Sequence, residues 1–160
     1  MKLEIDQSGK IEETAQPTVL AAINGGSRTI VLGGKTKRRL QEEFRKLGSP
    51  TVFVYNCFVV ALFLLIEPTL GKCSEIVIDH EYPGKESSIA ELLHLLFVEH
   101  HIENPPTIHF AYIGKSSQAH NLAIRTFRRQ IRPDQIISFE KMRKEIFTKK
   151  NGRPVLKYQV

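Results

Sequence analysis

The sequence predicts an α/β protein built on a mixed five-stranded sheet with helices on both faces. Three observations predict this class. Apolar runs of strand length open the chain, an Asn-Gly-Gly-Ser turn separates two of them, and strand-like and helix-like patterns alternate after Pro68. We therefore expect three consecutive antiparallel strands, followed by strand, helix, strand and helix.

The three predicted strands cover residues 2–14, 18–23 and 28–32, the first of them either running through Ser8-Gly9 or turning there. The sequence Asn24-Gly25-Gly26-Ser27 predicts a hairpin because Asn and Gly tolerate positive φ. Residues 35–47 then carry apolar side chains on one face amid charges, which indicates an amphipathic helix that ends at Gly48.

The apolar run from Val52 to Ile66 has two interpretations. It is either one buried helix, or a strand over residues 51–55 and a helix over residues 56–66 that Pro68 ends. About 15 residues is short of the roughly 20 that cross a bilayer as a helix, so we expect a core element and no membrane. A homodimer face is the alternative if the segment is not wholly internal.

The alternating part begins with a buried strand over residues 75–79. A helix over residues 87–101, capped by Ser87 or Ser88, and a strand over residues 107–113 follow. Ser116 or Ser117 then caps a helix that reaches about Gln130. Right-handed crossovers make the last two strands parallel neighbours.

Length and cysteine content favour a single domain in a reducing compartment. With 160 residues the chain can bury a core without staples, and we assign residues 1–148 to one domain and residues 149–160 to a loose basic tail. Cys57 and Cys73 have no second ligand pair nearby, so a disulfide framework or a structural zinc site is not expected. The N-terminus lacks a signal-peptide pattern, which makes the cytoplasm the expected location.

Positive charge is concentrated at the C-terminal end. From Arg125 onward there are 11 Lys and Arg against 3 Asp and Glu, which leaves a net charge of −2 for residues 1–124 out of the total of +6. Four arginines recur at helical spacing: Arg125, Arg128, Arg129 and Arg132. Such a stripe beside a basic tail suits a nucleic acid partner; the alternative is a solvated face that keeps the protein soluble.

Two aspartates end strand-like runs far apart in the sequence. Asp6 closes Leu3-Glu4-Ile5-Asp6, and Asp79 closes Ile76-Val77-Ile78-Asp79. Carboxylates at the ends of neighbouring strands are held rigidly at a wet edge, where they can share a divalent cation. The alternative is that Asp6 forms an Asx-type turn with Ser8-Gly9 and that Asp79 only begins a turn toward Pro83-Gly84.

This order of elements, with Asp6 on the first strand and Asp79 ending the fourth, resembles the ribonuclease H-like superfamily, which includes ribonucleases H, Holliday-junction resolvases, transposases and the PIWI nuclease module. The resemblance extends from Lys2 to about Gln130. It implies a ribonuclease H-like fold, and an active site in which Asp6 bridges two Mg²⁺ or Mn²⁺ ions while Asp79 holds one of them.

The resemblance also implies a metal ligand on the helix after the fifth strand, where this chain has His120 in place of an acid, as PIWI modules do. The family's glutamate on the first long helix has no clear counterpart, and Glu42, Glu43 and Glu67 are equal candidates. A less favoured alternative is that His80 and Glu81 support Asp79 as neighbours of the metal site. The alternative for His120 is that it binds no metal and is only a packed or solvent-facing histidine.

Substrate contacts are predicted at Lys115, beside a helix start whose free N–H groups bind phosphate, and at Arg125, Arg128 and Arg129. The predicted function is a divalent-metal-dependent nuclease that hydrolyses phosphodiester bonds. The alternative is a non-catalytic nucleic-acid-binding or assembly module with an incomplete acidic site. A P-loop is excluded because Gly33-Gly34-Lys35-Thr36 lacks the upstream glycine, where Thr29 stands.

Overall fold

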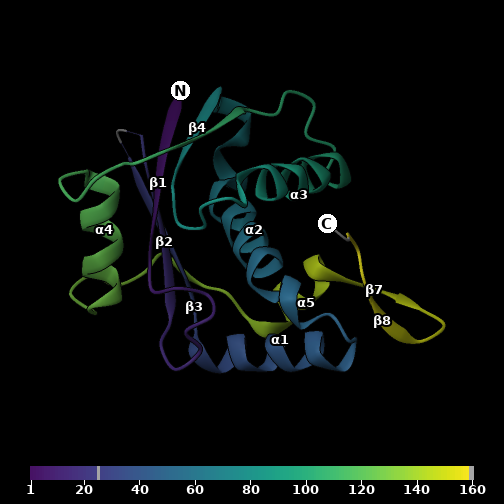
Figure 1. The fold of residues 1–160 in the computed structure, drawn as a ribbon. Helices are drawn as coiled ribbons and strands as arrows, with labels where there is room; N and C mark the ends of the chain where they lie inside the picture. Colours follow the sequence, from purple (N-terminus) through teal and green to yellow (C-terminus); the bar gives the residue numbers. More distant parts are fainter. Residues whose placement is uncertain (25, 159–160) are drawn as a thin grey trace.

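A computed structural model describes residues 1–24 and 26–158 and shows a mixed sheet flanked by helices (Figure 1). The strands of the sheet are β1 (Lys2–Ser8), β2 (Thr18–Ile23), β3 (Ser27–Leu32), β4 (Glu75–Asp79), β5 (Thr107–Ala111) and β6 (Gln135–Ile136). The α-helices are α1 (Gly34–Lys46), α2 (Phe53–Ile66), α3 (Glu86–Glu99), α4 (Gln118–Phe127) and α5 (Phe139–Ile146). A separate hairpin follows, formed by β7 (Phe147–Lys150) and β8 (Arg153–Leu156). The predicted α/β class is confirmed.

The sheet has six strands in the order β5-β4-β1-β2-β3-β6, one more than predicted. β1, β2 and β3 are antiparallel in sequence, and β4 and β5 are parallel neighbours, as expected. β4 also pairs in parallel with β1. The extra strand, β6, lies parallel to β3. Two residues are too few for a period-2 pattern, which is why the sequence did not predict it.

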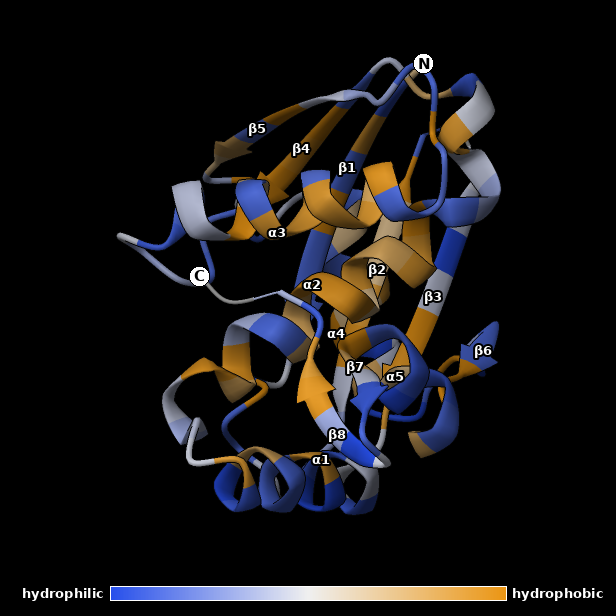
Figure 2. Cartoon of the chain, turned by 90° about the vertical axis from the view of Figure 1, so that its right-hand side faces the viewer, coloured by the Kyte–Doolittle hydropathy of each residue, from blue (hydrophilic) through white to orange (hydrophobic). Residues whose placement is uncertain are grey.

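Helices cover both faces of the sheet, with α4 on one side and α2 on the other (Figure 1). α2 is one helix, so the alternative of a strand over residues 51–55 is wrong: residues 50–52 form a short 3₁₀ turn that leads directly into it. Figure 2 shows α2 hydrophobic along nearly its whole length, whereas α1 is largely hydrophilic. α2 is therefore the centre of the main core.

One segment, Pro50–Lys72, is long and apolar enough to cross a membrane. However, 67% of its most apolar window is buried inside the fold, between the sheet on one side and α3 and α5 on the other. A helix that is hydrophobic all round is expected at such a position.

Of the two alternatives for the first strand, the turn at Ser8-Gly9 is observed: β1 ends at Ser8, Gly9 has a φ of +82°, and the chain from there to Pro17 forms a loop. Other predicted boundaries are wrong. α3 starts one residue before the serines proposed as its caps, because Lys85 is its N-cap. α4 starts after Ser117, as predicted, but ends at Phe127, because Arg129 adopts a φ of +60°.

The early end of α4 corrects the predicted arginine stripe. Only Arg125 lies on the helix; Arg128 is its C-cap, and Arg129 and Arg132 lie in the turn beyond it. Pro133 explains part of this difference, since a residue before proline is disfavoured in helical conformation.

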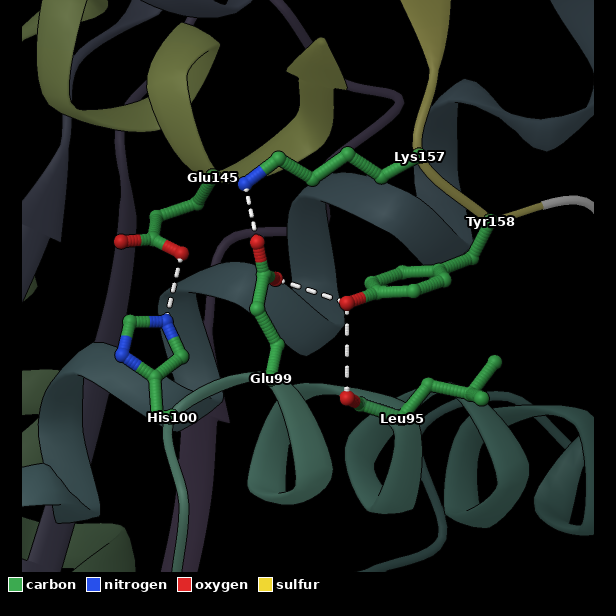
Figure 3. A network of polar contacts seen from close by, with 6 residues as sticks. All are labelled: Leu95, Glu99, His100, Glu145, Lys157 and Tyr158. Carbon is green, nitrogen blue, oxygen red and sulfur yellow. Dashed lines mark hydrogen bonds and ion pairs between the residues drawn. The ribbon is translucent and has the colours of Figure 1, made fainter.

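The C-terminal residues from 149 on, predicted as a loose tail, are instead part of the fold as far as the structure describes them. Glu99 on α3 holds the end of β8, because it accepts hydrogen bonds from Lys157 Nζ (2.5 Å) and from the Tyr158 hydroxyl (2.7 Å) (Figure 3). The Tyr158 oxygen also lies 3.4 Å from the carbonyl oxygen of Leu95. Residues 159 and 160 lie outside the described part.

The loop from Gly9 to Pro17 is held by a buried cation. Lys37 on α1 is fully buried, and its Nζ donates to the carbonyl oxygens of Lys10 (3.1 Å) and Glu13 (2.8 Å) and to the Thr18 hydroxyl (3.0 Å). Burial lowers the pKa of Lys37 to about 8. This lysine therefore fixes the loop that leaves the C-terminal end of β1.

Candidate metal centre

Three carboxylates from two separate segments meet at the sheet edge where β1 and β4 end. One oxygen each of Asp6, Asp79 and Glu81 lie within 4.8 Å of one another. Parallel pairing of β1 with β4 brings their carboxyl ends to the same edge, which places the two aspartates side by side. The predicted meeting of Asp6 and Asp79 is therefore present in the structure.

Asp6 is the innermost of the three, with a relative exposure of 4%. It lies on β1 opposite Ala21 of β2. Its Oδ1 accepts a hydrogen bond from the backbone N–H of Gln7 (2.8 Å), and its Oδ2 lies 2.8 Å from Nδ1 of His120. Both oxygens are thus already oriented.

A tight turn after β4 brings Glu81 to the cluster. The backbone N–H of Glu81 donates to the carbonyl of Asp79 (2.9 Å), an i to i+2 bond that folds the chain back on itself. Asp79 is fixed separately, because its Oδ1 accepts from the backbone N–H of Ile113 (2.8 Å). Glu81 therefore supplies the third acid, a place that the sequence prediction left among Glu42, Glu43 and Glu67.

None of those three glutamates belongs to the acidic cluster. Glu42 and Glu43 lie on α1, and Glu67 begins the 3₁₀ segment that follows α2. His80, between Asp79 and Glu81, pairs with Glu86 on α3 (3.1 Å). The only sequence signal for Glu81 was a second acid two residues after the strand-ending aspartate.

Electrostatics at the cluster favour a bound proton or cation. Burial raises the pKa of Glu81 to about 8, and the charge of Asp6, a hydrogen bond to Asp6 and the charge of Asp79 act in the same direction. Burial likewise raises the pKa of Asp6, against the lowering effect of its hydrogen bonds from Gln7 and His120. Around neutral pH Glu81 therefore keeps a proton, which reduces the repulsion among the three carboxylates. A bound divalent cation would relieve the same repulsion.

His120 joins the cluster through Asp6. It lies in the first turn of α4, where its backbone N–H donates to the Ser117 side chain that caps the helix (2.9 Å). Because a carboxylate accepts, we assign a ring proton to Nδ1. The side chain is 30% exposed, so the ring is partly open to solvent.

A polar contact behind the sheet edge supports β1 and the turn together. Gln7 Nε2 donates to the Tyr82 hydroxyl (3.0 Å) and to the carbonyl of Gly9 (3.0 Å). Tyr82 also accepts from the backbone N–H of Ile11 (3.3 Å) and packs its ring edge-on against Phe58 of α2. The segment that carries Glu81 is thus attached to the core.

The other predicted site residues lie outside this cluster. Lys115 is exposed in the turn before α4, and Arg125, Arg128 and Arg129 are exposed at the opposite end of that helix. The helix therefore separates the predicted phosphate contacts into two groups, one at each end, with His120 and Asp6 next to the first.

A second group of possible metal ligands, Glu99, His100 and Glu145, has an internal explanation (Figure 3). His100 Nε2 lies 2.8 Å from Glu145 Oε2, and Glu99 is neutralised by Lys157. These contacts connect α3, α5 and the end of the hairpin, so we interpret the group as structural.

Comparison of the chain with family models, with curated proteins and with solved structures gives no match. The interpretation of the site therefore depends on its own geometry.

Proposed function

We propose that this protein is a divalent-metal-dependent nuclease of ribonuclease H-like type. The observation that carries the proposal is the convergence of Asp6, Asp79 and Glu81 within 4.8 Å at one sheet edge. The strand order β5-β4-β1-β2-β3, with three antiparallel strands followed by two parallel ones, supports the same proposal, since it agrees with the resemblance noted in the sequence.

The donor set fits hard cations. Carboxylate oxygens are the ligands that Mg²⁺ and Mn²⁺ prefer, and an imidazole is better tolerated by Mn²⁺. Asp6, Asp79 and Glu81 would hold the metal, and His120 would orient Asp6 through their 2.8 Å contact. Bound metal would supply an activated water and neutralise the leaving oxygen of a phosphodiester.

The protein's own contribution is positioning. Asp6 is fixed by the Gln7 N–H and by His120, and Asp79 by the Ile113 N–H, so the carboxylates need little reorganisation to bind. Cationic side chains at both ends of α4, among them Lys115 and Arg125, would bind the substrate phosphates on either side of the acids.

The decisive experiment measures cleavage of labelled single-stranded and duplex oligonucleotides with Mg²⁺, Mn²⁺ or EDTA. We expect cleavage with metal only, and none in Asp6→Asn. The matched control is Glu4→Gln, which neutralises a half-buried acid two residues earlier on the same strand and outside the cluster. Cleavage by Asp6→Asn at the wild-type rate would overturn the proposal.

Metal binding is tested separately by thermal unfolding. At a metal concentration 100 times Kd, binding stabilises the fold by about 2.7 kcal/mol, which raises Tm by about 5 °C or more in a chain of this size. We expect this shift in wild type and Glu4→Gln and its loss in Asp6→Asn.

The second candidate function is a nucleic-acid-binding module without catalysis. It is favoured by the raised pKa of Glu81, whose largest cause is burial, because a cluster that keeps a proton has less need of a metal ion. This module would bind oligonucleotides with a steep salt dependence, and metal at millimolar concentration would change neither Tm nor the oligonucleotide.

A further inference from the structure

A groove of about 640 Å³ opens beyond the end of α4, at the same sheet edge as the acidic cluster. Its walls come from the start of α1, the loop before β2, and the turn that follows α4 and leads to β6. It is formed by fixed elements: Arg38 Nη1 donates to the carbonyl of Thr14 (2.6 Å), and Asp134 accepts from the backbone N–H of Thr29 (2.7 Å).

The rim of the groove carries charge of one sign. Four cations line it, Lys35, Arg38, Arg129 and Arg132, and none of the lining residues is acidic. Within the described part of the chain, none of the four forms an ion pair. A polyanion would therefore find cations that no carboxylate of the protein neutralises.

The floor of the groove is apolar. Val19, Val31, Phe127 and Ile131 line it, and Ile136 is 71% exposed there, one of the few large apolar side chains at the surface. An apolar, partly aromatic floor beneath guanidinium groups suits the faces of unpaired bases, whose stacking is worth about 1–3 kcal/mol per base. If the cations served only to keep the protein soluble, no apolar surface would be expected beneath them.

The groove and the acidic cluster are joined by α4. His120 at the helix start contacts Asp6, and Phe127 at its end packs beside Gly9, three residues after Asp6 on the same chain. His120 and Phe127 are seven positions apart, which corresponds to about 10 Å of helix. This distance is short enough for one strand of nucleic acid to reach from the groove to the acids.

We propose that this groove is a binding subsite for an unpaired segment of nucleic acid, with phosphates on Lys35, Arg129 and Arg132 and a base on the Phe127 and Ile136 floor. It deepens the proposed function, because the strand held there would continue to the acids at the start of α4. An acidic peptide would satisfy the charges, but it would not explain a floor aligned with a candidate cleavage site.

Binding of a 15-nucleotide single strand, measured by fluorescence anisotropy in EDTA, tests the subsite without catalysis. The double variant Lys35→Ala/Arg132→Ala should weaken binding at least tenfold and reduce the salt slope by about 1.4, the value for two lost phosphate contacts. The control Arg45→Ala/Lys72→Ala removes the same charge from exposed positions outside the groove and should change binding less than twofold.

The floor is tested by Ile136→Glu, with Val98→Glu as its match, because Val98 on α3 is equally exposed at 73%. We expect tenfold weaker binding for the first and little change for the second. A blunt-ended duplex of the same sequence should bind more weakly than the single strand. Equal losses for groove and control variants, duplex binding as tight as single-strand binding, or tighter binding of a 15-residue polyglutamate would each overturn the proposal.

The two proposals fail in different ways. If the groove variants lose binding while wild type cleaves nothing with any metal, the subsite holds and the nuclease proposal fails. If wild type cleaves and the groove variants bind and cleave as wild type does, the nuclease holds and the subsite is wrong.

Discussion

His120 Nδ1 lies 2.8 Å from Asp6 Oδ2, a contact between residues 114 positions apart that joins the first strand to the helix on its open face. It gives one carboxylate of the cluster a fixed orientation and connects that carboxylate to a partly exposed ring. The contact therefore bears on how tightly the cluster can bind a metal ion.

Replacing His120 by Ala should weaken metal binding without abolishing it. Removing a partner that orients a metal-binding carboxylate typically costs 10- to 100-fold in affinity or activity. We expect a Kd for Mn²⁺ about tenfold higher in His120→Ala, measured by thermal shift against metal concentration, whereas Asp6→Asn shows no saturable shift. An unchanged Kd would show that His120 takes no part in metal binding. Asn121→Ala, an exposed neighbour on the same helix, serves as control.

Metal-free stability should fall as pH rises. The pKa of Glu81 is about 8 in the fold and near 4.5 when unfolded, so between these values the folded chain keeps a proton that the unfolded chain has lost. Stabilisation is complete below pH 4.5 and is lost as pH passes 8. The shift corresponds to about 3 kcal/mol between pH 5.5 and 8.5, and solvent screening of this partly exposed side chain reduces it, so urea unfolding at these two pH values should show a loss of about 2 kcal/mol from this group.

In Glu81→Gln the pH-dependent loss should largely disappear, because the amide cannot ionise. In wild type, by contrast, the stabilisation that Mg²⁺ or Mn²⁺ adds should increase as pH rises, because metal and proton compete for the same oxygens. A wild-type profile as flat as that of Glu81→Gln would show that the acids are not in contact in solution.

Gly9→Ala should be far more destabilising than Gly48→Ala. Both glycines have positive φ, +82° and +70°, so both substitutions carry the same conformational cost of about 1–2 kcal/mol. At Gly9 the added Cβ would also clash with the Pro17 carbonyl and lie 2.8 Å from the Phe127 ring, whereas nothing lies within 4 Å at Gly48. We expect a difference of about 2 kcal/mol or more in the free energy of unfolding. Similar losses at both sites would contradict the close packing of α4 on β1.

Lys157→Met should release the C-terminal hairpin while the sheet stays folded. The change leaves Glu99 partly buried without its cation, which costs about 1–3 kcal/mol locally. Limited proteolysis should then cleave within residues 147–156 several times faster than in wild type. Lys141→Met, an exposed lysine on α5, should not change the cleavage rate.

The sequence predicts those parts of the molecule that have a strong local signal. The hairpin between β2 and β3, the buried strand at residues 75–79 and the helix cap at Ser117 each depend on a few adjacent residues, and each is found. The neighbouring position of β1 and β4, which brings Asp6 to Asp79, has no local signal and was inferred from the order of elements along the chain.

What the sequence did not predict depends on contacts between distant segments. α5 combines a capping Ser138 with buried Met142 and Ile146, and no helix was predicted there. Glu81 becomes part of the cluster only through the turn after β4 and the burial that raises its pKa. The groove needs α4, α1 and β6 together, so no window of sequence contains it.

The enclosure of α2 also has a consequence for how the chain must be made. Its apolar surface is covered partly by α3 and α5, which leave the ribosome later than α2 itself. Nascent chains that end before Met142 therefore present a nearly uncharged helix to the cell, a segment that chaperones and other unfinished chains would bind.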